Sequence, residues 1–162
     1  MPLLTSDAKG VFVISVTPFT EAGEIDFESL DRVVDFYFER GAHGLTILGM
    51  MGEAPKLTQA ESRAVAERVI KRAGDKPVVV GVSAPGLAAI GELGKAVMDM
   101  GAAGVMVTTP VALKTDPQIY GYFGQVARVL GDGVPICLQD FPLVTGVQIL
   151  SLIHISSPRD SS

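Results

Sequence analysis

Hydrophobic residues along this chain fall into two alternating patterns, short continuous runs and stripes at helical spacing. The continuous runs are rich in β-branched residues, which predicts strands that begin near residues 11, 44, 77, 104 and 135. Between the runs, apolar positions recur at i, i+3, i+4 and i+7, the spacing of a helix that buries one face. The expected strands cover residues 11–19, 44–48, 77–83, 104–110 and 135–142, and residues 147–149 are expected to approach a fifth helix.

Capping residues mark three of the helix starts. Asp26 is placed to cap the first helix, because its side chain can accept a hydrogen bond from a free N–H of the first turn. Thr58 and Glu61 have the spacing of a capping box, which predicts where the second helix begins. Asp116 followed by Pro117 is typical of an N-cap residue and a proline at the first helical position of the fourth helix.

The strand and helix pattern repeats about every thirty residues, which favours a parallel sheet. Such a sheet is either doubly wound or closed as a (β/α)8 barrel. The first strand-to-helix turn lacks the G-x-G-x-x-G fingerprint of a dinucleotide fold, and this favours the barrel. A complete barrel needs about 250 residues. We therefore predict an α/β fold in which residues 1–149 form the N-terminal portion of a (β/α)8 TIM barrel, about five β/α units.

Residues 150–162 break this pattern and end in serines. Their natural back-translation resembles a transposon-end sequencing adapter that has lost one base. We expect these residues to be a non-native tail, translated from adapter, and the true gene to continue further. The alternative is a genuine divergent C-terminus. Under the adapter hypothesis His154 carries no functional weight.

Composition excludes several classes of function. The net charge is −5 and basic residues form no stripe, which argues against a nucleic-acid partner. No apolar run approaches the ~20 residues of a membrane helix, and the N-terminus has no signal-peptide pattern. The single cysteine, Cys137, excludes a disulfide framework and fits a reducing, cytoplasmic compartment. No His, Cys and carboxylate set has metal-ligand spacing, so we expect no metal, and we expect no cofactor.

The most distinctive stretch follows the second strand. There, Gly49 and Gly52 bracket Met50 and Met51, and Glu53 comes next. Glycine permits a tight turn, and such a turn can direct several backbone N–H groups at one point, where they hold an anion such as a carboxylate. A plain strand-to-helix connection without a ligand is the alternative.

Five short motifs give the chain a family resemblance. They are Val16-Thr-Pro-Phe19, Gly49-x-x-Gly-Glu53, Val80-Gly-Val-Ser83, Thr109-Pro110 and Phe141-Pro-x-x-Thr-Gly146. At this spacing, from about residue 8 to 149, the chain resembles the dihydrodipicolinate synthase / N-acetylneuraminate lyase family of class I pyruvate-dependent lyases. The motifs are much less specific for the substrate than for the family.

The resemblance implies a lyase or aldolase that acts on a 2-keto acid, such as pyruvate, through a lysine Schiff base. In the family a lysine of strand six forms that bond, the turn after strand two holds the substrate carboxylate, and a tyrosine of strand five relays protons. The lysine lies beyond residue 149, so we expect no catalytic residue here and an inactive chain. The parent is expected to be a homo-oligomer, a tetramer by resemblance. The implied substrate-binding positions are Thr17, Gly49, Met50, Met51, Gly52 and Gln139.

Several of these positions depart from the family pattern. Met50 and Met51 replace two threonines, Gln139 replaces the proton-relay tyrosine, Ala112 a second tyrosine and Val144 an arginine. If the methionines line the pocket, they suggest a bulkier or less polar 2-keto substrate, or an altered reaction; alternatively, they fill space under the loop. The parent could also be a non-catalytic ligand-binding or regulatory barrel, or an unrelated barrel enzyme that binds phosphate.

Other polar residues have plainer expected roles. Glu53 either accepts backbone N–H bonds in the turn or is solvated, and Gln139 either bonds a ligand or is a buried amide. Lys56 and Lys114 follow strand ends, but we expect solvated side chains rather than substitute catalytic amines. Cys137 is expected to be a small core residue of strand five.

Overall fold

The computed structural model describes residues 3–149, which form one five-stranded sheet with helices packed on it. The elements in chain order are β1 (Phe12–Ile14), α1 (Phe27–Glu39), β2 (Gly44–Ile47), the 3₁₀ turn η1 (Ala54–Lys56), α2 (Gln59–Ala73), β3 (Val78–Gly81), α3 (Leu87–Asp99), β4 (Gly104–Thr108), α4 (Asp116–Leu130), β5 (Ile136–Gln139) and α5 (Pro142–Thr145).

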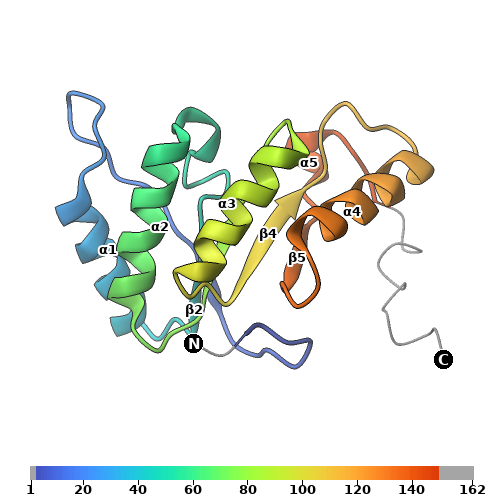
Figure 1. Cartoon of the computed structure of the whole chain (residues 1–162). Helices are drawn as coiled ribbons and strands as arrows, with labels where there is room; N and C mark the ends of the chain where they lie inside the picture. The colour runs from blue at the N-terminus through green and yellow to red at the C-terminus, as the bar shows by residue number, and fades with distance from the viewer. Residues whose placement is uncertain (1–2, 150–162) are drawn as a thin grey trace.

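The sheet topology decides between the two predicted parallel folds. All strands are parallel and lie in the order β1-β2-β3-β4-β5, with no reversal of strand order. Successive right-handed crossovers without a reversal place their helices on the same face. In Figure 1 helices α1 to α4 accordingly lie side by side in front of the strands. This is the arrangement of part of a barrel, not of a doubly wound sheet, whose helices cover both faces.

The main core lies between this sheet and its helices. Alternate strand residues point into it, among them Val78 and Val80 of β3, which are fully buried. The apolar stripe of α2 packs on them through Val65 and Val69, each 1% exposed. A short apolar side chain at every second strand position thus fixes which sheet face the helices cover.

The opposite face of the sheet, the inner face, is curved. Gly49 lies just past the end of β2, and a Cβ atom added to it would lie 3.3 Å from Met106 Cε of β4 and 3.8 Å from Ile14 Cγ2 of β1. In a flat sheet β1 and β4 are about 14 Å apart, because neighbouring strands are spaced at ~4.8 Å. Their side chains reach one point because the sheet curls around the inner face, as a barrel wall does.

Helix capping confirms two of the three predicted starts and corrects the third. Asp26 accepts a hydrogen bond from Ser29 N at 2.9 Å, and Thr58 and Glu61 form the reciprocal capping box. For α4 the N-cap is Thr115, which forms a capping box with Gln118, so Asp116 and Pro117 are its first two helical residues. The predicted N-cap was one residue too far along the chain. Both Thr115 and Asp116 are residues favoured at the N-cap, and proline is tolerated at either of the first two helical positions, so the sequence did not distinguish them.

The expected strands were too long at their C-terminal ends. β1 ends at Ile14, not at residue 19, and β5 ends at Gln139, not at residue 142. Pairing stops there because the chain leaves the sheet to form the loops that precede the helices. Pro142 instead begins α5, and Val147 and Ile149 pack on Ile119 of α4. The fifth helix expected after residue 149 and the predicted tail at residues 150–162 both lie outside the described residues.

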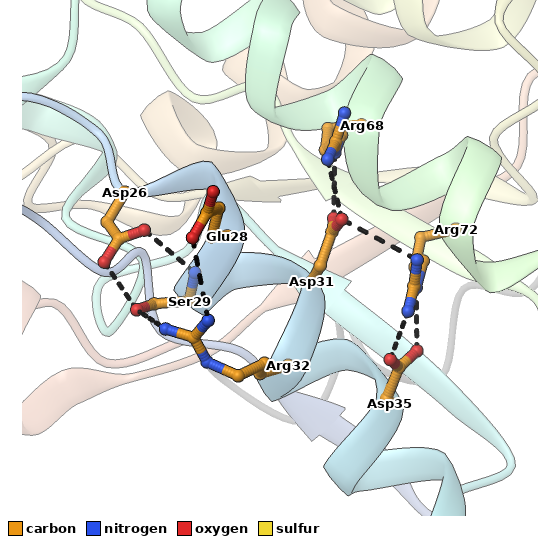
Figure 2. Close-up of polar contacts among 8 residues, drawn as sticks. All are labelled: Asp26, Glu28, Ser29, Asp31, Arg32, Asp35, Arg68 and Arg72. Carbon is orange, nitrogen blue, oxygen red and sulfur yellow. Dashed lines mark hydrogen bonds and ion pairs between the residues drawn. The ribbon is translucent and has the colours of Figure 1, made fainter.

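An ion-pair cluster on the outer surface joins α1 to α2. Figure 2 shows Arg68 and Arg72 of α2 reaching across to Asp31 and Asp35 of α1. Arg68 donates two hydrogen bonds to Asp31, at 2.8 and 2.7 Å, and Arg72 contacts both carboxylates. These guanidinium groups lower the pKa values of Asp31 and Asp35. The cluster aligns two neighbouring helices of the outer layer.

Candidate active site

The turn after β2 has an unusual backbone. Leu48 and Glu53, at its two ends, are the only non-glycine residues of the described chain with positive φ, both 54°. Inside the turn, a Cβ atom on Gly52 would lie 3.0 Å from Leu48 N, so the backbone folds back closely on itself. Positive φ values at non-glycine residues are sparse and persist only where surrounding contacts hold them, and they concentrate at ligand sites.

Thr17 holds this turn against the segment that follows β1. Its side chain is buried, and its Oγ1 donates a 2.8 Å hydrogen bond to the carbonyl oxygen of Gly52. The hydroxyl has one proton, which this bond uses. A carboxylate needs donors, so Thr17 supports the turn instead of donating to a substrate anion. The structure thus brings together Thr17 and Gly52, two of the predicted site residues.

Gly81 is a supporting residue whose role the sequence did not reveal. It ends β3, and a Cβ atom at this position would lie 2.1 Å from the carbonyl oxygen of Leu48. Only glycine lets β3 approach the turn so closely. The Val80-Gly-Val-Ser83 motif contained this residue, but a glycine in a strand run gives no sign of what touches it.

Met50 and Met51 project from the turn. Their side chains are 40% and 57% exposed in the described part of the chain, so they do not fill space beneath the loop. Both thioether side chains therefore lie at the surface of the turn in the described chain. Residues 49–52 have no polar side chain, so the polar groups of this part of the turn are those of the backbone.

Gln139 lies at the same end of the sheet but not beside the turn. It is the last residue of β5, half-buried, and β3 and β4 separate it from β2. Thr108 of β4 lies beside it, with its Oγ1 3.5 Å from the Gln139 carbonyl oxygen, and Ser83 Oγ accepts a hydrogen bond from Thr108 N at 3.0 Å. Thr108 ends β4 and Ser83 follows the end of β3, so both residues lie at the end of the sheet where the turn follows β2.

The expectation for Cys137 was wrong. This residue lies on the inner face beside Met106 and is exposed, because no strand of the described residues 3–149 lies beyond β5. Partial desolvation by the surrounding protein still raises the pKa of its thiol. Among the lysines near the turn, Lys56 pairs with Glu53 at 2.5 Å and is largely exposed, as expected of a solvated side chain.

Other features of the described residues limit the chemistry. Residues 3–149 contain no cluster of three His, Cys, Asp or Glu side chains placed to hold a metal ion. None of the helices in this part of the chain is long and apolar enough to cross a bilayer. What the site offers is a strained glycine turn, braced by β1 and β3, at the C-terminal ends of parallel strands, where barrel proteins bind their substrates.

A model of the dihydrodipicolinate synthetase family matches residues 7–156. The chain belongs to this family. A dihydrodipicolinate synthase structure from Rhodopseudomonas palustris is 51% identical and superimposes with a TM-score of 0.92 over 95% of this chain and 51% of that one. A 4-hydroxy-tetrahydrodipicolinate synthase from Sorangium cellulosum is 41% identical over 86% of this chain and 47% of its own length.

The predicted fold is confirmed by these relatives: the five strands and their helices match an N-terminal part of a TIM barrel. The chain spans about half the length of the curated family members it matches. A family structure from Acinetobacter baumannii, a dihydrodipicolinate synthase complexed with pyruvate, is 30% identical with a TM-score of 0.79, over 86% of this chain and 48% of that one.

Proposed function

We propose that this chain forms the N-terminal part of the active site of a lyase that joins or cleaves carbon–carbon bonds of a 2-keto acid. In the full-length parent a lysine of strand six forms a Schiff base with the keto carbon. Desolvation inside a barrel lowers the pKa of such a lysine and frees the amine as a nucleophile. Strand six is not among the described residues 3–149, and we propose that these residues alone do not support the reaction.

The braced turn after β2 is the observation that carries the proposal. Thr17 and Gly81 hold its backbone from two sides, through a hydrogen bond to Gly52 and a close approach to Leu48. A rigid turn of this kind keeps backbone N–H groups in place to receive the substrate carboxylate. Family membership and a pyruvate-bound relative support a 2-keto acid as the ligand.

The exposed methionines bear on the substrate. Met50 and Met51 bring no hydroxyl donor to the turn, and Gln139 brings an amide where the family's proton-relay tyrosine would stand. A thioether or an amide does not exchange protons near neutral pH, so the parent needs another group or a water for that step. We infer a 2-keto substrate that is bulkier or less polar than pyruvate, or an altered reaction.

A second candidate is a ligand-binding or regulatory barrel without catalysis, and Gln139 is the observation that favours it. An amide at the tyrosine position retains hydrogen bonding but removes acid–base chemistry. The two candidates differ in whether strand six of the parent supplies a lysine that points into the barrel.

The test is Schiff-base trapping on the parent, recovered by sequencing past codon 149. The protein is incubated with borohydride and either pyruvate or a branched 2-keto acid, and its molecular mass is then measured by mass spectrometry. The lyase proposal expects a mass gain of one reduced adduct, mapped to a strand-six lysine, and none on chain 1–162. A folded parent that yields no adduct with either acid supports the binding barrel instead.

The same sequencing tests the proposed tail. If residues 150–162 are translated from adapter, their codons should be absent from an independent clone. If they are a genuine C-terminus, the same codons should be present. We further infer a cytoplasmic parent from the single cysteine. From the family resemblance we also infer that the parent is a homo-oligomer, a tetramer. Light scattering on the parent measures its oligomeric state.

A further inference from the structure

A row of polar side chains crosses the inner face of the sheet at the C-terminal ends of three neighbouring strands. Thr108 ends β4, Gln139 ends β5 directly opposite it, and Ser83 lies two residues beyond the end of β3. Side chains of a strand alternate between its two faces. Thr108 lies two residues beyond Met106, which is on the inner face, so Thr108 and its neighbour Gln139 share that face.

Close contacts join the three residues of this row. Thr108 N donates a hydrogen bond to Ser83 Oγ at 3.0 Å, and Thr108 Oγ1 lies 3.5 Å from the Gln139 carbonyl oxygen. The bond from Thr108 N uses a lone pair of the Ser83 hydroxyl and not its proton, so this hydroxyl can still donate. Gln139 adds a side-chain amide, which carries both donors and an acceptor. The row therefore offers donors and acceptors side by side.

The row begins next to the turn after β2. Gly81 lies on the inner face opposite Met106, and a Cβ atom on it would lie 2.1 Å from Leu48 O and 3.3 Å from Gly49 N of the turn. Ser83 is two residues further along, about 7 Å away, because a parallel strand rises ~3.3 Å per residue. From Ser83 the row continues across two strand spacings, roughly 10 Å. A three-carbon acid held at the turn is too short to contact all of it.

The polarity of the row bears on the chain of the substrate. An alkyl chain laid along it would displace water from hydroxyl and amide groups without replacing their hydrogen bonds, and each such loss costs free energy. A hydroxyl group on the substrate both donates and accepts, so it satisfies either kind of partner. A site built to bond hydroxyl groups rejects the analogue that lacks them. A carboxylate at the turn and hydroxyl groups along the row therefore fit one molecule.

We propose that Ser83, Thr108 and Gln139 select a 2-keto acid whose carbon chain carries hydroxyl groups beyond the keto carbon. The proposal rests on the proposed binding of a 2-keto acid at this site, and it makes the substrate bulkier than pyruvate but not less polar. Ser83 and Thr108 act on specificity, whereas the bond-making step belongs to the strand-six lysine. Selection depends on the row and not on the Schiff base.

Binding of two six-carbon acids to the full-length parent tests the proposal. One acid is 2-ketohexanoate, and the other is the same chain with a hydroxyl group on each of its last three carbons. The strand-six lysine, where present, is replaced by alanine so that neither acid is turned over. Isothermal titration calorimetry should show that the hydroxylated acid binds at least about tenfold more tightly, the effect of one net hydrogen bond or more.

Three variants locate this preference. Thr108→Val, which retains the N–H bonded to Ser83, and Ser83→Ala should each bring the two Kd values to within about threefold of one another. Thr109→Val is the matched control, because Thr109 Oγ1 is buried without a hydrogen-bond partner among the described residues, and the tenfold preference should persist in it. Circular dichroism checks that each variant is folded. If Ser83→Ala does not fold, Ser83→Thr, which keeps the hydroxyl, should retain the preference that Thr108→Val loses.

The outcomes separate this proposal from the lyase proposal. Equal affinity for the two acids, tighter binding of 2-ketohexanoate, binding of neither acid, or an unchanged preference in Thr108→Val overturns the selection by the row. Borohydride trapping on the parent with its lysine intact is scored separately. An adduct with pyruvate but no preference for the hydroxylated acid contradicts the selection alone. A preference for the hydroxylated acid without any adduct contradicts the lyase alone.

Discussion

At the scale of the residue, two buried threonines near the strand ends make opposite use of their hydroxyl groups. Thr17 Oγ1 donates to Gly52 O at 2.8 Å, whereas Thr109 Oγ1 is buried with no hydrogen-bond partner among the described residues. A buried hydrogen bond contributes about 1 kcal/mol, and an orphaned polar group costs free energy. The same chemical change at these two sites therefore has different consequences.

Thr17→Val should lower the free energy of unfolding by about 1–2 kcal/mol, because it leaves the Gly52 carbonyl unpaired. Thr109→Val, its matched control, should be neutral or slightly stabilising. Urea titration of chain 1–162 followed by circular dichroism measures both. Equal losses at the two positions would show that the hydroxyl of Thr17 does not brace the turn.

Gly81 gives a second prediction at this scale. Gly81→Ala should cost about 3 kcal/mol, since its Cβ would lie 2.1 Å from the Leu48 carbonyl oxygen and the turn would have to shift. Gly121→Ala, on the exposed side of α4 with nothing within 4 Å of the new Cβ, should instead stabilise by up to about 1 kcal/mol. Thermal unfolding of the two variants compares them, and a tolerated Gly81→Ala would contradict the close approach.

At the scale of the element, the ion-pair cluster between α1 and α2 makes stability depend on pH. Arg68 and Arg72 lower the pKa values of Asp31 and Asp35 in the folded chain. A carboxylate whose folded pKa is depressed contributes stability above its unfolded value of about 4, and this contribution is lost as pH falls through the folded value. High salt weakens it too, because the groups are partly exposed.

Asp31→Asn should therefore reduce stability near pH 7 and flatten the loss of stability below about pH 4. Asp75→Asn, in the exposed loop after α2, is the control for removing one negative charge. Urea midpoints measured between pH 2.5 and 7, at low and high salt, provide the comparison. A parallel pH profile for Asp31→Asn and the unchanged chain would mean that the cluster contributes nothing measurable, as is common for surface ion pairs.

At the scale of the whole molecule, open edges should make stability uneven across the sheet. β3 is central and its valines are buried, whereas β1 and β5 each have a neighbouring strand on one side only within residues 3–149. Local opening costs least where few contacts are lost. Amide hydrogen exchange of chain 1–162 should thus be slowest in β3 and β2 and fastest in β1 and β5. Uniform protection across all five strands would contradict this, and would point to covered edges.

The periodicity of apolar residues along the chain was sufficient to predict the strands and helices and their order. Every predicted strand and the first four helices exist, because apolar runs and stripes at Val78, Val80, Val65 and Val69 reflect burial that each element needs wherever it packs. The ends of elements were harder. β1 and β5 stop early and α5 begins at Pro142, since strand ends are decided by pairing partners that the local sequence does not contain.

For the site, sequence alone identified the glycine turn after β2 and the methionines in it, because glycines between an apolar run and a helix signal are a local feature. Only the tertiary structure decided what holds the turn. The Thr17 hydrogen bond and the Gly81 approach join segments 35 and about thirty residues apart, and the exposure of Cys137 follows from the edge position of β5. Such long-range contacts depend on the curl of the sheet, which no single stretch of the chain encodes.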